Sequence, residues 1–206
     1  MNLLIDIVPT NVEIDNKKYK INTDFRTSIL FELLIQDNSL EQKEKLMKAL
    51  KLYYPVVPKN IDEAIEKILW FYKCGKDFQF GDNSKSKKST GTKRELEYSF
   101  EYDDEYIYAA FLDQYNIDLQ DIDYLHWWKF RAMFNSLKED NLIVKMMGYR
   151  SVNLSEITDK EQRKQIKKMK ELYKLPKIVD KESEEYRLSI EEALLNGGDI
   201  SNLVQK

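Results

Sequence analysis

The sequence predicts a mainly α-helical fold with a small β-hairpin near the N-terminus. Apolar side chains recur every three to four residues along most of the chain, which places them on one face of a helix. The 206 residues include only 6 Gly and 4 Pro, so residues that interrupt helices are rare. A chain of this length can form one domain, or two small ones, around a hydrophobic core.

The β-hairpin is predicted from two short segments in which apolar and polar side chains alternate. They cover residues 12–14 and 19–21 and flank the polar sequence Asp15-Asn16-Lys17-Lys18. Residues 3–8 are apolar enough to add a third strand.

Three helices are expected next, each from its own start and stop signals. The first begins after Thr23 or Asp24 and runs to about Asp37. The second opens with a capping box at 39–42 and ends before Pro55, and the third opens with a similar box at 60–63 and stops at Gly75. Their inner faces are predicted to hold Phe25, Ile29, Leu30, Leu33 and Leu34, then Leu46, Leu50 and Tyr53, then Ile65, Ile68, Leu69 and Tyr72.

Aromatic residues are densest between residues 98 and 149, and we expect a helical hairpin there. Its first helix begins after Asp103 or Asp104 and stops at Asn116, a residue that tolerates the left-handed conformation. Its second helix, 122–137, is capped by Asp118 or Asp121 and is apolar on two sides, as in a helix buried between neighbours. The inner residues are Ile107, Tyr108, Phe111, Leu112 and Tyr115 in the first helix, and Trp127, Phe130, Phe134 and Leu137 opposite Leu125, Trp128 and Ala132 in the second.

The chain is therefore divided into four parts. Residues 1–80 hold the hairpin and three helices, and 81–97 form a flexible linker or loop, because GDNSKSKKSTGTKR offers no apolar side chain to bury. Residues 98–176 form the aromatic-rich region, which packs on the first part and ends with a helix from a capping box at 158–161 to Tyr173. Residues 177–206 are a partly helical tail.

The residues that usually carry chemistry are few. His126 is the only histidine and Cys74 the only cysteine, so metal sites of several histidines and internal disulfides are excluded. His126 is expected to be a hydrogen-bonded core residue. The carboxylates between 101 and 123 lack the spacing of a calcium loop and are interpreted as helix caps and solubilising groups. Phosphate-binding loops and nucleophile elbows are also missing. We expect no enzyme, no metal and no cofactor.

Charge and hydropathy indicate an intracellular protein. The net charge is only −3, so no global field favours nucleic acid or membrane. The segment MNLLIDIVPT lacks the basic start of a signal peptide, and no apolar run reaches the roughly 20 residues of a membrane helix. The single cysteine fits a reducing compartment.

Two features could carry binding. Arg163, Lys167, Lys170 and Lys174 form a basic face on the helix 159–174 that could contact phosphates, although Glu161 and Glu171 interrupt it and favour a solvated face. The 13 Tyr, 9 Phe and 3 Trp exceed what a small core hides, which favours a protein partner. The candidate partner-binding residues are Tyr106, Tyr108, Tyr124 and Trp128.

Three further segments stand out: YSFEYDDEYIYAAFLDQYNIDL, YLHWWKFRAMFNSL and MGYRSVNLSEITDKEQRKQIKKMKELYKLP. They resemble the bacteriophage Gp15 family, which is encoded in tail gene clusters of phages and prophages of Gram-positive bacteria. Family members are encoded between the major tail protein and the tape measure, where tail assembly chaperones usually lie.

The resemblance implies a tail assembly chaperone that binds the tape-measure protein, the major tail protein or both, in the host bacterial cytoplasm. A structural tail component and a nucleic-acid-binding module that uses the basic helix are the alternatives. Self-association stays open.

Overall fold

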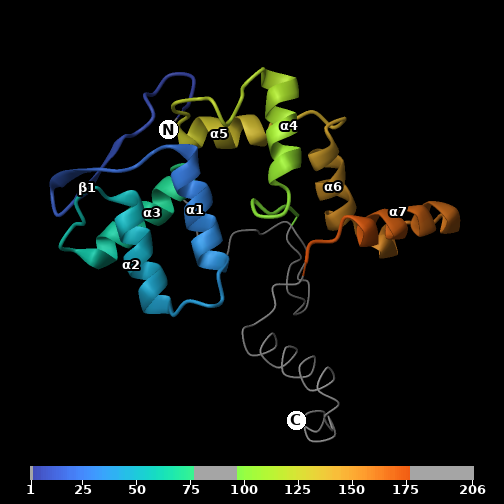
Figure 1. The fold of residues 1–206 in the computed structure, drawn as a ribbon, viewed down its shortest axis with the longest axis horizontal. Helices are drawn as coiled ribbons and strands as arrows, with labels where there is room; N and C mark the ends of the chain where they lie inside the picture. Colours follow the sequence, from blue (N-terminus) through green and yellow to red (C-terminus); the bar gives the residue numbers. More distant parts are fainter. Residues whose placement is uncertain (1, 77–96, 177–206) are drawn as a thin grey trace, which may run out of the picture.

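The computed structural model describes residues 2–76 and 97–176, and it confirms the mainly α-helical fold with one N-terminal hairpin (Figure 1). In chain order the elements are β1 (Asn11–Ile14), β2 (Lys17–Lys20), α1 (Phe25–Gln36), α2 (Gln42–Tyr53), α3 (Ile61–Tyr72), α4 (Asp104–Tyr115), α5 (Trp127–Phe134), α6 (Leu142–Ser151), the short 3-10 helix η1 (Leu154–Glu156) and α7 (Lys160–Leu172). The expected linker sequence 81–94 and the expected tail 177–206 lie outside the described residues.

The hairpin turns more tightly than the sequence predicts. Asp15 and Asn16 alone form the turn with φ of 48° and 58°, the pair of left-handed residues that a type I′ turn requires, so Lys17 and Lys18 belong to β2. The third strand is absent from the described N-terminal residues. The backbone N–H groups of Ile5 and Asp6 donate to the carbonyl of Asn2, which closes a local turn where a strand would be extended.

The starts of α1 and α3 are confirmed, whereas the start of α2 differs. The Asp24 side chain accepts from the N–H of Arg26, and the Asn60 side chain accepts from that of Glu63. The expected capping box at 39–42 does not form. The Ser39 hydroxyl instead donates to the Asp37 carboxylate at 2.6 Å, and α2 begins after Glu41 without a side-chain cap.

Aromatic packing shifts the buried side of several helices away from the predicted leucines. Phe31 makes edge-to-face contacts with Tyr53 and Tyr72, with ring centroids 5.4 and 5.2 Å apart, and this turns its neighbour Leu30 to solvent. The predicted inner residues Leu46, Leu69 and Leu112 are exposed as well. Smaller residues take the buried positions where helices approach each other, namely Ser28, Ala49, Ala64 and Ala110.

Helix α5 starts five residues later than the sequence predicts. The carbonyl of Leu125 accepts from the N–H of Phe25 at 2.9 Å, and the N–H of Trp127 donates to the carbonyl of Thr23 at 2.8 Å. These bridges to the start of α1 use groups that a longer helix would need for itself. His126 caps α5, because its Nδ1 accepts from the N–H of Trp128 at 3.1 Å.

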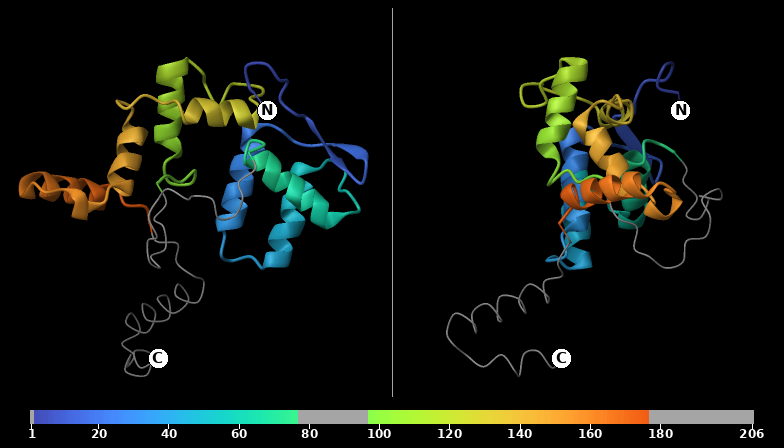
Figure 2. Two further views of the ribbon diagram at one scale, coloured as in Figure 1. Left: turned by 180° about the vertical axis from the view of Figure 1, so that it is seen from behind. Right: turned by 90° about the vertical axis from the view of Figure 1, so that its right-hand side faces the viewer.

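Two tryptophans of α5 connect it to the end of α3. The indole N–H of Trp127 donates to the carbonyl of Tyr72 at 2.8 Å, and that of Trp128 donates to the carbonyl of Phe71 at 2.7 Å. The last carbonyls of a helix lack partners in the next turn, and here the indoles supply donors to them, although the Phe71 carbonyl also accepts from the N–H of Cys74 at 2.9 Å. The aromatic region is thereby packed on the N-terminal helices, as the views in Figure 2 show.

Helix α6 is not expected from the sequence and is held by a buried ion pair. The Arg150 guanidinium makes two bonds to the Asp103 carboxylate, of 2.6 and 2.9 Å. It also donates to the carbonyls of Glu97 and Tyr173. The Asp103 side chain therefore pairs with Arg150 and does not cap α4, although Asp103 is the residue that precedes this helix.

Gly75 and Gly148 provide a matched pair of substitutions with opposite expected effects. A Cβ at Gly75 would lie 2.8 Å from Cη2 of Trp128, and φ there is +66°, so Gly75→Ala should lower the unfolding free energy by about 2 to 4 kcal/mol. A Cβ at Gly148, inside α6, meets nothing within 4 Å, so Gly148→Ala should raise it by about 0.5 to 1 kcal/mol. Urea unfolding of both variants measures the difference, and equal effects would contradict the packing of Trp128.

Candidate protein-binding groove

A groove of about 590 Å³ lies between α1 and α4. Its floor is apolar and its rim is polar. The floor consists of Phe25, Ile29, Phe100, Ile107, Leu119 and Phe130. The rim carries Arg26, Asp104, Glu105 and Gln120, with Tyr108 beside them. An apolar floor with a few polar groups at its edge is typical of binding sites.

The floor is held in place by stacked aromatic rings. Phe130 of α5 stacks on Phe25 of α1 and on Phe111 of α4, with ring centroids 4.8 Å apart in each case. Because Phe130 and Phe111 are fully buried, the floor has little freedom to collapse. The groove is therefore formed before any partner arrives.

Arg26 fixes the wall of the groove that lies between α4 and α5. Its guanidinium donates to the carbonyls of Leu119 and Ile122, each at 2.8 Å, and its Cζ lies 4.6 Å from the centre of the Phe25 ring. The loop that precedes α5 is thus attached to α1. This attachment keeps Leu119 in the floor.

Tyr108 is the one predicted partner-binding residue that lines the groove. Its hydroxyl donates to the Asp118 carboxylate at 3.0 Å, and this hydrogen bond raises the pKa of the Tyr108 phenol. The bond attaches the Tyr108 side chain to the loop that follows α4.

The other predicted tyrosines are on the surface, and the predicted tryptophan is not. Tyr106 lies on α4 and is exposed, and Tyr124 is 51% exposed with its hydroxyl 2.8 Å from Oγ1 of Thr23. Trp128 is only 2% exposed, because its ring packs against Trp70, Phe71 and Gly75. Its selection as a contact residue is therefore corrected, since it belongs to the core.

The predicted basic face of α7 is partly used within the chain. The Arg163 guanidinium donates to the carbonyl of Ile157, and Lys170 Nζ donates to the carbonyls of Arg150 and Val152. Lys174 Nζ lies 3.7 Å from the Glu171 carboxylate. Lys167 is exposed. Arg163 and Lys174 are exposed too, so the role of this face in binding stays a prediction.

A metal site, a membrane helix and a nucleophilic cysteine each have their own structural requirements. Within residues 2–76 and 97–176, His, Cys, Asp and Glu side chains nowhere gather in a group of three that could hold a metal ion. None of the helices described there is long and apolar enough to cross a membrane. Burial raises the pKa of the Cys74 thiol, the opposite of what a nucleophile requires.

The sequence reasoning missed Arg26, Asp104 and Glu105 as site residues. Arg26 joins the groove only because distant residues meet there, so no local signal marks it. The two carboxylates lie at the start of α4, as the sequence predicts, and their place on the rim follows from where α4 lies relative to the α1 residues that line the groove.

The comparisons with known proteins place the chain in a phage family. A family model described as "Bacteriophage Gp15 protein" matches residues 4–175, a range that includes both walls of the groove. No curated protein and no solved structure matches the chain significantly.

His126 should make the stability of the fold depend on pH. Burial lowers its pKa below the ordinary value of 6.5, and Nδ1 must stay unprotonated to accept from Trp128 while Nε2 donates to the carbonyl of Pro9. The unfolded chain therefore binds more protons below pH 6.5, so this stability is complete above pH 6.5 and is lost as the pH falls below it.

Thermal unfolding between about pH 7.5 and pH 5.5 tests this dependence. Asn is a preferred capping residue and does not titrate, so His126→Asn should melt with less pH dependence than the wild type. Because the chain has only one histidine, the difference between the two profiles belongs to His126. Identical profiles would contradict a neutral, hydrogen-bonded His126.

Proposed function

The chain belongs to the bacteriophage Gp15 family, and from this membership we propose that it is a tail assembly factor, a chaperone that binds the tape-measure protein, the major tail protein or both. The proposal includes a role in binding and none in catalysis. It assigns the protein to the host cytoplasm, where tails are assembled.

The apolar groove between α1 and α4 is the observation that supports this proposal most directly. A tape-measure chain is long and mostly helical, so it exposes apolar stripes until tail subunits enclose it. An amphipathic helix can bind by laying such a stripe into an apolar groove. The apolar floor of the groove, which includes Phe25 and Phe130, offers that surface. Because these two rings are already stacked in the free protein, a partner would not have to order them on binding.

The rim of the groove indicates which helices fit. Asp104 and Glu105 place two carboxylates beside the apolar floor. A partner helix with Lys or Arg next to its apolar stripe would satisfy them, whereas an acidic helix would be repelled. Tyr108 adds an aromatic ring that can cover such a basic side chain.

Tyr108→Ala should weaken binding to tape-measure fragments with only a small effect on the fold. Loss of an aromatic hot-spot contact costs about 2 kcal/mol or more, about 30-fold in affinity, whereas the hydrogen bond to Asp118 is close to solvent, so its loss should change the unfolding free energy little. The matched control is Leu112→Ala, an exposed residue of the same helix outside the groove, which should bind as the wild type does. Titration calorimetry and melting curves measure the two effects.

Trp128→Ala separates a core residue from a contact residue. Its indole is buried, so truncation should cost about 3 to 5 kcal/mol of stability.

The chaperone proposal would be overturned if the wild-type protein bound neither tail protein. It would also be overturned if mass spectrometry found many copies in each finished virion, which indicates a structural tail component.

A further inference from the structure

Charge is strongly segregated along this chain even though its net charge is only −3. Residues 97–123 contain nine Asp and Glu and no Lys or Arg, and of these acids only Asp103 is held in an ion pair with Arg150 in the part that the structure describes. Helix α7 carries six Lys and Arg against two Glu. One acidic region and one basic helix thus lie on the same protein.

Helix α7 projects from the body of the protein beyond α6 (Figures 1 and 2). It packs mainly against α6 and η1, and none of its residues, all within the described range, is buried. Its attachment is at its end, where the Tyr173 ring stacks on Tyr149 and the Tyr173 carbonyl accepts from Arg150. An amphipathic helix that is this exposed has a large surface available to a partner.

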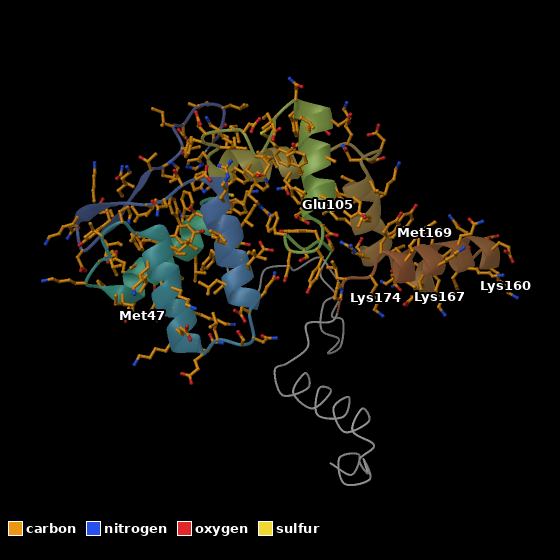
Figure 3. All side chains as sticks on the ribbon, in the orientation of Figure 1. Met47, Glu105, Lys160, Lys167, Met169 and Lys174 are labelled. Carbon is orange, nitrogen blue, oxygen red and sulfur yellow. The ribbon has the colours of Figure 1, made fainter. Side chains whose placement is uncertain are left out.

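One row of α7 combines basic and apolar side chains. Lys164, Lys168 and Leu172 follow at intervals of four residues, so they lie one above the other on the helix. Both lysines are exposed, and Leu172 is 65% exposed, the highest value of any large apolar side chain in α7. Figure 3 shows how Lys167 and Lys174 lie along one edge of the helix while Met169 points to the opposite edge.

The α1/α4 groove has the complementary features. It is apolar within and acidic at its rim, where Asp104 and Glu105 face solvent. Helix α7 of the same chain is anchored beyond α6, on the far side of α4 from α1, so it does not reach its own groove (Figure 1). A second copy of the chain is not restricted in this way.

We propose that α7 of one copy docks in the α1/α4 groove of a second copy, with Leu172 on the apolar floor and Lys168 against Glu105. The contact joins two different surfaces, so each bound copy still offers a free groove and a free α7. It extends into a ring or an open chain of copies, and salt weakens it because its charges lie at the surface. The proposal concerns the purified chain alone and does not depend on a tail partner, although a tail helix would compete for the same groove.

Charge reversal on each side tests the contact. Sedimentation of the wild type at rising concentration and low salt should show self-association, and Glu105→Lys and Lys168→Glu should each weaken it at least tenfold. An equimolar mixture of the two variants should associate again, because the introduced carboxylate of one variant meets the introduced ammonium group of the other. A chain that carries both substitutions should associate for the same reason.

The control Asp113→Lys reverses an exposed acid on α4 outside the groove and should associate as the wild type does. Melting curves show that each variant is folded.

Three results would overturn the proposal. The first is a wild type that stays monomeric at all concentrations. The second is association that neither reversal weakens, which would place the contact elsewhere. The third is a mixture of the two variants that remains monomeric. If the wild type is monomeric and Lys168→Glu instead abolishes binding to double-stranded DNA, then α7 is a nucleic-acid surface.

Discussion

The two indole hydrogen bonds at the end of α3 determine where α5 lies. The carbonyls of Phe71 and Tyr72 are in the last turn of α3, where the Phe71 carbonyl accepts from the N–H of Cys74 and from Trp128, and the Tyr72 carbonyl accepts from Trp127. Trp127 and Trp128 reach them from adjacent positions on α5. Once α5 is fixed there, Phe130 must stack on Phe25, and the floor of the groove follows. The groove is thus a consequence of how one helix end obtains its hydrogen bonds.

Local signals predict much of this fold, because several helices begin or end at a single residue that caps them. Asp24 and Asn60 cap their helices with their own side chains, and Asn116 ends α4 with φ of 52°. Helix α7 also starts where expected, although Asp159 caps it in place of Thr158, the first residue of the expected capping box. These outcomes depend on a few neighbouring residues, so they can be read from a short stretch of sequence. The resemblance to the phage family is likewise carried by continuous segments.

The remaining features depend on distant residues. Helix α6 contains Ile143, Val144 and Gly148, which form helices poorly, and its position depends on Arg150 meeting Asp103 forty-seven residues earlier. Helix α5 starts later than expected because Leu125 and Trp127 make backbone hydrogen bonds to Phe25 and Thr23 at the start of α1. The groove is lined by residues from α1, α4, α5 and the loops between them, which meet only in the folded chain, so its floor and its acidic rim have no signal in the sequence.

Arg150 has a consequence for communication within the molecule. Its guanidinium binds Asp103 at the start of α4, which forms one wall of the groove, and also binds the carbonyl of Tyr173 at the end of α7. One side chain therefore connects the α4 wall of the groove to the end of α7. If a ligand moved α4, Arg150 would carry that movement to α7, and by thermodynamic linkage a ligand of α7 would act on the groove by the same factor. The two surfaces of this chain are joined through one buried ion pair.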